Sequence, residues 1–496
     1  MKFLCPENLD VAKLLAEHPP AFKCRNLKPQ YFSFLIDLLC SLPLKHPDAV
    51  TEENYVLLSS QILKKCISQY QLYLRYLLTH GVIETDGTFV SSSIATDNNP
   101  ARSIGYRFTK KYQTKNNLVE IDDRKLERLL KSGFRLSERQ KVEYRHLIRW
   151  FNHRLTIDVE RALECNQKHY DGIKDDEEKW GYKKVVHPVY GEVNSCEKKN
   201  PFPAYQACIG QVHALNQKQY MLSVGTNSRR FFSNLTGLNK RLRPFLRFDN
   251  KELVGLDVGN CQPYLLLVLF NPTFWEGADK SFNWKEVRQS NLINRYKKSL
   301  NSAFSSLYSG NFPMCAKLAE IRSSKGFQEF QALVSRGEFY QTFFERHKES
   351  FYDEMIYELD DLKKRFLRYI NIGYRCSDVV SRKFKMDYPE IDEWLTYFKK
   401  SDSLEAKKRS AKIGKKTKFP GLSRLLMSIE SSIMLFRIPR GLCEFGFTSP
   451  VFTIHDSLIT TIQDYTEVEI IMELVLEECV GIEPFIKKEI WSEKNG

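Results

Sequence analysis

Two aspartates follow apolar runs that are typical of β-strands, and their carboxylates are the first candidates for chemistry. Asp257 lies near the end of "LVGLDV", residues 253–258, and Asp456 lies within "VFTIHDSLITTIQ", residues 451–463. A carboxylate at the end of a buried strand is unfavourable unless it is paired or bound to a metal. If the two meet, they form a site for Mg²⁺, and paired metal ions can hold the attacking and leaving oxygens of phosphoryl transfer.

The two aspartates are far apart in the chain, so they can meet only if their strands belong to one sheet. Taken singly, an aspartate at a strand end is more typical of a turn or a helix cap. The apolar flanks of residues 451–463 favour a hairpin, which would place His455 and Asp456 at its turn. Such a hairpin would present the Asp456 carboxylate while its flanks stay buried.

The composition is compatible with a nucleic-acid partner. The chain has 496 residues, a formal net charge of +14 and a hydrophobic fraction of 42%, so a globular, basic protein is expected. A basic excess of this size indicates a polyanion such as nucleic acid, although a merely soluble basic surface would also show it. The twelve cysteines include no CxxC pair, which favours a reducing, cytoplasmic compartment, prokaryotic or viral, over a cysteine metal site.

No association with a membrane is expected. The N-terminus, "MKFLCPENLD", reaches acidic residues within its first ten positions, which is unlike a signal peptide. The longest apolar run, "PYLLLVLF" at residues 263–270, is too short to span a bilayer. The sequence leaves the oligomeric state open.

The first part of the chain, residues 1–115, has the pattern of a small nucleic-acid-binding domain. Helical periodicity at residues 31–42 and 61–84 precedes two short alternating runs, which is the order of a winged helix; an unrelated small α+β domain would give the same pattern. Residues 116–225 are highly charged and predict a helical connector or thumb-like region. Within it, residues 121–155 predict one or two amphipathic helices, and residues 166–192 predict exposed loops.

The remainder of the chain predicts two short stretches of sheet on either side of a long helical region. A strand at residues 252–258 is followed by an apolar helix after Pro263, and residues 283–430 have mostly helical patterns. A helix at residues 423–438, the hairpin and a final helix at residues 465–481 then complete the chain. The fold class expected from this order is α+β.

The two aspartate motifs resemble those of the core shared by family A DNA polymerases and the phage-type single-subunit RNA polymerases. "GLDVGNCQPYLLLVL", residues 255–269, is similar to the first palm motif, and "TIHDSLITT", residues 453–461, is similar to the last. The resemblance covers residues 228–496. It implies a right-hand polymerase with an antiparallel palm sheet at residues 226–300 and 426–496 and helical fingers at residues 301–425.

The resemblance also implies roles for individual residues. Asp257 and Asp456 would be the catalytic metal ligands, the main-chain carbonyl of Val258 would be a further ligand, and His455 would lie near the primer end. The cofactor implied is two Mg²⁺ ions, with Mn²⁺ as an alternative. The partners implied are a nucleic-acid template and primer and nucleoside triphosphates.

A fingers helix that binds the triphosphate is represented by "DDLKKRFLRYINIGYRCS", residues 360–377. Aligning Gly373 with the glycine of the family motif gives the cationic role to Lys364, and another register gives it to Arg368. The two lie four residues apart and share one helix face, which an ordinary solvated helix would also show. Tyr374 is the nearest tyrosine, but Ile372 occupies the position of the family's tyrosine, so the choice of sugar stays open.

Further segments fit the same order. "RGEFYQTFFERH", residues 336–347, resembles the stretch before the fingers helix. "SRLLMSIESSIMLF", residues 423–436, resembles the helix before the last palm motif, with Glu430 facing the site. A basic segment at residues 228–246 could hold template or primer phosphates, or it could be a plain basic connector. Its candidate phosphate ligands are Arg229, Arg230, Lys240 and Arg243.

The residue types at the two motifs disagree about the product. Gln262 occupies the position of the glutamate that excludes ribose in family A DNA polymerases, whereas Ser457 matches the His-Asp-Ser form of the RNA enzymes. We favour DNA synthesis in the replication of a phage, plasmid or mobile element, with a single-subunit RNA polymerase or primase-like enzyme as the alternative. The first 220 residues show no acidic trio for a proofreading exonuclease.

Two functions of other classes are also considered. A non-catalytic DNA-binding replication initiator would use only the N-terminal domain. A phosphohydrolase built on His455 and Asp456 would need more metal-binding histidines, and only His347 and His455 lie beyond His213.

Overall fold

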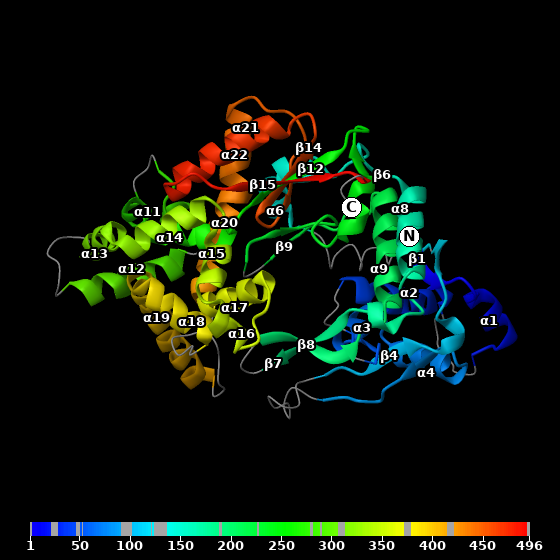
Figure 1. Cartoon of the computed structure of the whole chain (residues 1–496). Helices are drawn as coiled ribbons and strands as arrows, with labels where there is room; N and C mark the ends of the chain where they lie inside the picture. The colour runs from blue at the N-terminus through cyan, green and yellow to red at the C-terminus, as the bar shows by residue number, and fades with distance from the viewer. Residues whose placement is uncertain are drawn as a thin grey trace.

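The computed structural model shows a mixed α and β protein, so the expected α+β class is confirmed. No helix in the described part of the chain is long and apolar enough to cross a membrane. Figure 1 shows helices α11–α19 on one side, the N-terminal segments on the other and a small sheet between them. The structure describes residues 2–20, 28–45, 50–51, 53–90, 102–120, 122–123, 136–187, 191–225, 228–277, 281–287, 290–305, 313–371, 378–413 and 421–493.

The N-terminal segment has its own hydrophobic core, which includes Phe32, Tyr73 and Leu77. Its sheet has the antiparallel order β2-β4-β3. Residues 61–84 do not form one helix, because the backbone of Ile67 is extended and divides the apolar pattern between two helices. The elements are β1 (Lys2–Pro6), α1 (Val11–Glu17), α2 (Pro29–Lys45), β2 (Val56–Leu57), α3 (Ser60–Cys66), α4 (Tyr70–Thr79), β3 (Ile83–Thr85) and β4 (Gly105–Phe108).

The N-terminal strand joins this segment to the next. β1 pairs antiparallel with β5 (Asn116–Glu120), and Lys2 lies opposite Glu120. This pairing crosses residue 115, where the sequence predicts a domain boundary.

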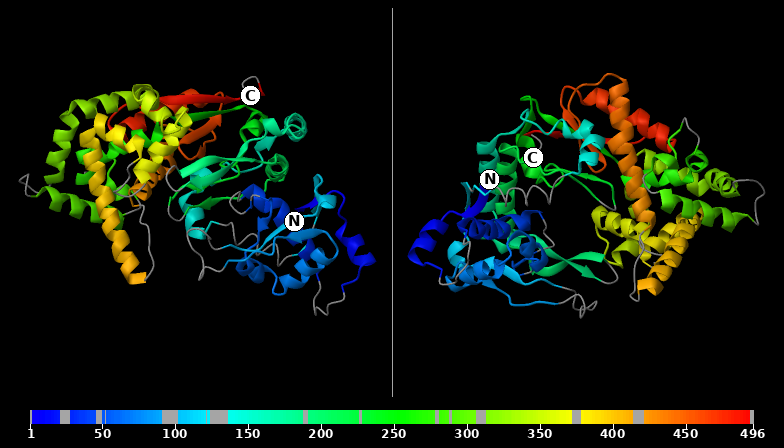
Figure 2. Two further views of the ribbon diagram at one scale, coloured as in Figure 1. Left: turned by 60° about the horizontal axis from the view of Figure 1, so that its bottom comes forward. Right: turned by 180° about the vertical axis from the view of Figure 1, so that it is seen from behind.

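The charged middle of the chain contains a hairpin where loops are expected. β7 (Tyr182–His187) pairs with β8 (Gly191–Lys198), and both strands extend toward α16 and α17 (Figures 1 and 2). Polar and charged residues dominate both strands, so the sequence shows no apolar alternation to predict them. The other elements here are α6 (Glu138–Glu143), α7 (Arg145–Ile148), β6 (Leu155–Ile157), α8 (Val159–Asp171), α9 (Phe202–Asn216), β9 (Ser223–Val224), β10 (Phe231–Phe232) and β11 (Leu246–Phe248).

The central sheet is antiparallel and has the strand order β13-β14-β12-β15. Its strands are β12 (Leu253–Val258), β13 (Phe452–Ile454), β14 (Ser457–Thr461) and β15 (Ile486–Trp491). Because strand side chains alternate between faces, Val254, Leu256 and Val258 pack into the helical core. Leu253 lies on the other face, in the core that also contains Ile459 and Trp491.

The helical side of the molecule is held by a large aromatic core, which includes Phe330, Phe384 and Trp394. A π-helical turn, Ile433–Arg437, joins the last two helices before the hairpin. The helices are α10 (Cys261–Leu266), α11 (Pro272–Glu276), α12 (Ser290–Phe304), α13 (Pro313–Ser323), α14 (Lys325–Ser335), α15 (Phe339–Arg346), α16 (Lys348–Tyr352), α17 (Leu359–Asn371), α18 (Val379–Asp387), α19 (Pro389–Ile413), α20 (Gly421–Ser432), α21 (Ile438–Glu444) and α22 (Tyr465–Val480).

The last strand, β15, was not predicted, although it completes the sheet beside β12. Trp491 at its end is 3% exposed, and the Arg243 guanidinium lies 5.0 Å from the centre of its ring. Gly255 on β12 packs closely against Trp491. A Cβ added to this glycine would lie 3.4 Å from the indole nitrogen of Trp491. The tryptophan therefore anchors the edge strand to the sheet.

We expect Trp491→Ala to lower the free energy of unfolding by about 3 kcal/mol, because it leaves a cavity under β15. The midpoint of urea unfolding, followed by far-ultraviolet circular dichroism, measures the loss. Ile490→Ala is the matched control, since Ile490 is its neighbour in the strand and is 39% exposed. Equal losses in the two variants would contradict the anchoring role.

Candidate active site

The pairing of β12 with β14 brings the two aspartates together. Asp257 lies opposite Ser457 in the strand register, and the Ser457 hydroxyl donates a hydrogen bond to Oδ1 of Asp257. Asp456 immediately precedes β14, and its main-chain carbonyl accepts a hydrogen bond of 3.4 Å from the Val258 amide. Asp257 near the end of β12 and Asp456 in the turn before β14 therefore lie at the same end of the sheet.

The surroundings of Asp456 are acidic. Burial, together with the nearby charges of Asp257 and Glu430, raises the pKa of Asp456 to about 7. Beside it, burial and the charge of Asp456 raise the pKa of the Cys261 thiol well above its usual range. An ionised carboxylate at this position is therefore unfavourable in the protein alone, and a bound cation would relieve the repulsion.

A buried ion pair supports the site from α20. Glu430 is 1% exposed and accepts two hydrogen bonds of 2.7 Å from the Arg230 guanidinium. It also accepts one of 3.0 Å from the Gln262 amide. The structure thus brings Arg230, Gln262 and Glu430 together next to the aspartates. The Arg230 guanidinium is engaged with Glu430 in this structure. Its role in binding phosphate stays a prediction.

His455 lies at the hairpin turn with a left-handed backbone, φ +55°. Its ring packs edge-on against Phe232, with ring centres 5.6 Å apart. Burial and the charge of Arg230 lower the pKa of His455 to about 4, so the imidazole is neutral near pH 7. Its Nδ1 is buried, and no hydrogen-bond partner for it occurs among the described residues. The neutral imidazole therefore lies half-buried beside Phe232 and Arg230.

The other three candidates in the basic segment differ in their surroundings. Arg229 precedes β10 with a left-handed backbone, φ +59°. Lys240 is exposed on a 3₁₀ turn, Lys240–Phe245. Arg243 forms an ion pair of 3.0 Å with Glu489 on β15. Their roles in binding phosphates stay predictions.

The predicted triphosphate-binding residues lie on α17. Lys364 is exposed and forms an ion pair of 3.4 Å with Asp361, and Arg368 is half-buried on the same helix. Tyr374 lies outside the described residues. The structure therefore places the two cations on one helix, and their contact with a nucleotide stays a prediction.

Two residues near the aspartates have no clear signal of a functional role in the sequence. β12 lies between β14 and β15, and Lys487 on β15 is paired with Asp257 across the sheet. The two side chains therefore lie on the same face of the sheet. Asn260 follows β12 with a left-handed backbone, φ +53°, and its buried Nδ2 lacks a hydrogen-bond partner within the described ranges. Asparagine after a strand end is a signal for such a turn, whereas Lys487 gives no signal until its strand is paired.

The donor set fits a hard divalent cation, since it consists of carboxylate and main-chain oxygens. In the part of the chain that the structure describes, no group of three or more His, Cys, Asp or Glu residues forms a metal site. Asp257, Asp456 and the main-chain carbonyl of Val258 stay predicted metal ligands. Mg²⁺ is commonly bound by one or two carboxylates together with water and substrate phosphates.

Comparison of the sequence with protein-family models and with curated proteins gave no match. Among solved structures, the chain is similar to the POL domain of Pol1 from M. smegmatis, which was solved in complex with a DNA primer-template and dNTP. The TM-score is 0.32 and the identity 11%, over 74% of this chain and 72% of that chain. A TM-score of this size does not establish a shared fold or function. The function proposed below therefore rests on the geometry of the site.

The raised pKa of Asp456 predicts how stability depends on pH. The native state binds this proton more tightly than the unfolded state, so the contribution to stability is lost as the pH rises toward about 7. In metal-free protein we expect Asp456→Asn to raise the unfolding temperature by about 5 °C near pH 8 and to change it little near pH 4.

Differential scanning calorimetry in EDTA at the two pH values makes this measurement. Asp249→Asn is the control, because the hydrogen bond from Arg154 lowers the pKa of Asp249. Removing the charge of Asp249 should therefore not stabilise the protein near pH 8. An Asp456→Asn variant that is less stable near pH 8 would show that the carboxylate is not held in a repulsive environment.

Proposed function

We propose that the chain is a template-directed nucleotidyltransferase, a nucleic-acid polymerase that uses two metal ions. The observation that carries this proposal is the closeness of Asp257 on β12 to Asp456 in the turn before β14, with a raised pKa at Asp456. Two carboxylates placed in this way favour phosphoryl transfer over the other classes of function. The basic net charge of +14 suits a nucleic-acid substrate.

The metal would be held by Asp257, Asp456 and the carbonyl of Val258. When bound, Mg²⁺ or Mn²⁺ lowers the pKa of a coordinated hydroxyl and stabilises charge that develops on phosphate oxygens. In the proposed reaction, a primer 3′-hydroxyl attacks the α-phosphate of a nucleoside triphosphate. A new bond forms between the 3′-oxygen and the α-phosphorus, and the 3′-hydroxyl gives up its proton. The bond from the α-phosphorus to the oxygen shared with the β-phosphate breaks, so the β- and γ-phosphates leave together as pyrophosphate.

The residues around the metal position have supporting roles in this proposal. Ser457 fixes the orientation of the Asp257 carboxylate through its hydrogen bond. Lys364 and Arg368 would neutralise the triphosphate from α17, and His455 would contact the primer end as a neutral imidazole. In this proposal the N-terminal segment, with α2, β2, α3, α4, β3 and β4 in that order, acts as a winged helix that holds duplex nucleic acid.

DNA is the product that we favour, in the replication of a phage, plasmid or mobile element. The Gln262 amide donates a hydrogen bond of 3.0 Å to Glu430. This bond holds the Gln262 side chain in a defined position near the aspartates. A side chain of this size, fixed next to the aspartates, would crowd a ribose 2′-hydroxyl. An RNA polymerase or primase-like enzyme is the alternative if that crowding is absent.

We expect Asp257→Asn and Asp456→Asn each to reduce nucleotide incorporation on a primed template by at least about 10³-fold, because each removes a metal ligand. Primer extension with labelled primer in Mg²⁺ measures the rate, and circular dichroism checks that the variants fold. Asp175→Asn is the control, since Asp175 is exposed. If both variants still incorporate nucleotides, the assignment of the two aspartates as metal ligands is wrong. If the unchanged protein binds DNA but incorporates no nucleotide, the replication initiator is favoured.

The choice of sugar is tested by Gln262→Ala. We expect the ratio of kcat/KM for dNTP to that for NTP to fall by roughly tenfold, because the smaller side chain no longer crowds the 2′-hydroxyl. Both values of kcat/KM are measured on the same variant. A general loss of activity lowers both values and therefore leaves their ratio unchanged. An unchanged ratio would mean that another residue selects the sugar.

A further inference from the structure

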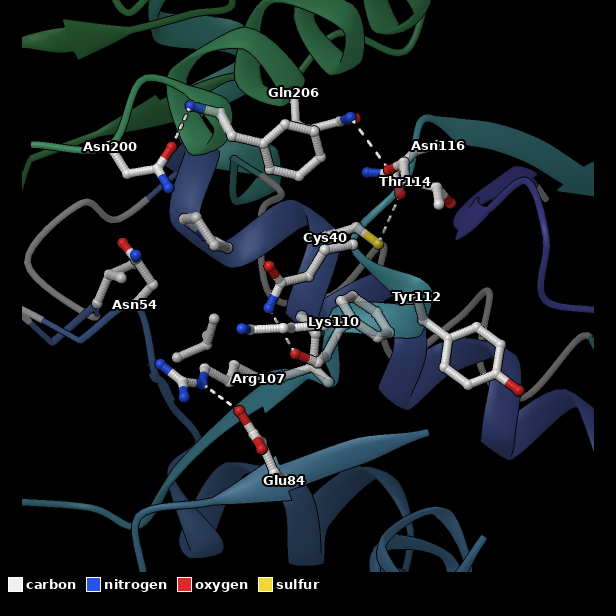
Figure 3. Close-up of a pocket in the computed structure, with 17 residues that line it drawn as sticks. Cys40, Asn54, Glu84, Arg107, Lys110, Tyr112, Thr114, Asn116, Asn200 and Gln206 are labelled. Atoms are coloured by element: carbon white, nitrogen blue, oxygen red, sulfur yellow. Dashed lines mark hydrogen bonds and ion pairs between the residues drawn. The ribbon is translucent and has the colours of Figure 1, made fainter. Parts of the chain in front are cut away.

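A cavity of about 500 Å³ lies away from the aspartates, between the N-terminal segment and the start of α9 (Figure 3). Its walls come from α2, β4, the 3₁₀ turn Lys110–Tyr112, and residues Asn200, Phe202 and Gln206. No residue assigned above to the polymerase site lines it. A volume of this size is typical of pockets that bind small molecules.

One wall of the cavity is cationic. Arg107 and Lys110 lie next to each other there in Figure 3. Arg107 is partly neutralised, since its Nε donates a hydrogen bond of 2.5 Å to Glu84. For Lys110, by contrast, the described residues provide no carboxylate partner. The ammonium group of Lys110 is therefore available to an anion.

The wall on α9 has an unmet hydrogen-bonding group. Gln206 is 6% exposed, and its Nε2 donates a hydrogen bond of 3.3 Å to the carbonyl of Thr114. Its Oε1 is buried and has no donor within the described ranges. A buried acceptor without a partner is costly, so a ligand that donates a hydrogen bond here would be favoured.

Apolar surface between these groups includes three aromatic residues, Phe108, Tyr112 and Phe202, together with Leu39 and Pro43. Further polar groups of the lining come from Asn54, Thr114, Asn116 and Asn200. A matching ligand needs an anionic group for Lys110, an apolar, planar body and a hydrogen-bond donor for Gln206. A base with an exocyclic amino group, joined to one phosphate through its sugar, combines all three.

We propose that this cavity binds one nucleotide, either free or as an unpaired nucleotide of a strand. The proposal does not rest on the polymerase function, because no residue is shared between the two sites. α9 contributes Cys208, Val212 and Leu215 to the core that also holds Leu253 of β12. A nucleotide in the cavity would therefore contact both the N-terminal segment and the helix that packs against the central sheet.

The test uses the full chain carrying Asp257→Asn, in EDTA, so that binding at the metal site does not contribute. The probe is 2-aminopurine deoxyribonucleoside monophosphate, whose fluorescence falls on stacking against an aromatic ring. A second arm uses a short single strand with one internal 2-aminopurine. Saturable binding in the first arm identifies a free nucleotide, and saturable binding in the second arm alone identifies a nucleotide of a strand.

We expect Lys110→Glu to weaken binding by at least about tenfold, and Gln206→Leu to weaken it by a similar factor. Lys111→Glu is the matched control, since Lys111 is adjacent in the same turn and does not line the cavity. The proposal is overturned if neither arm saturates, if Lys110→Glu and Lys111→Glu behave alike, or if the nucleoside without phosphate binds as tightly as the nucleotide.

Discussion

The antiparallel pairing of β12 with β14 holds the two aspartates and both hydrophobic cores in place. The register that puts Asp257 opposite Ser457 also puts Asp456 next to the main chain of Val258. A shift of one residue would turn Asp257 to the other face of the sheet, into the helical core. The buried side chains on both faces of β12 prevent that shift, because they would have to leave two different cores.

Bringing the aspartates together creates a local excess of negative charge, and the surrounding elements offset only part of it. Arg230 neutralises Glu430 through two hydrogen bonds, whereas Asp456 retains a raised pKa. A protein that needed only stability would not keep an uncompensated carboxylate here. The uncompensated charge is the feature on which the proposed cation-dependent function rests.

Several parts of this arrangement could be predicted from local patterns. The apolar runs around Asp257 and Asp456 predicted the strands and the hairpin, and helical periodicity predicted most of the helices after Pro263. The hairpin of β7 and β8 could not be predicted, because its residues are polar and show no alternation. β15 was missed for a related reason: half of its residues are charged, and it is a strand only because β12 offers it an edge.

The residue types at the site can be read directly from the sequence: two aspartates next to apolar runs, a histidine beside one of them, and a basic chain around them. Which of these groups interact follows only from the way the chain folds. The pair of Arg230 with Glu430 joins residues that are 200 positions apart, and Lys487 faces Asp257 only through the sheet register. The physical reason is that strand identity follows from local residue patterns, whereas charge compensation and pairing depend on contacts between segments that are distant in the chain.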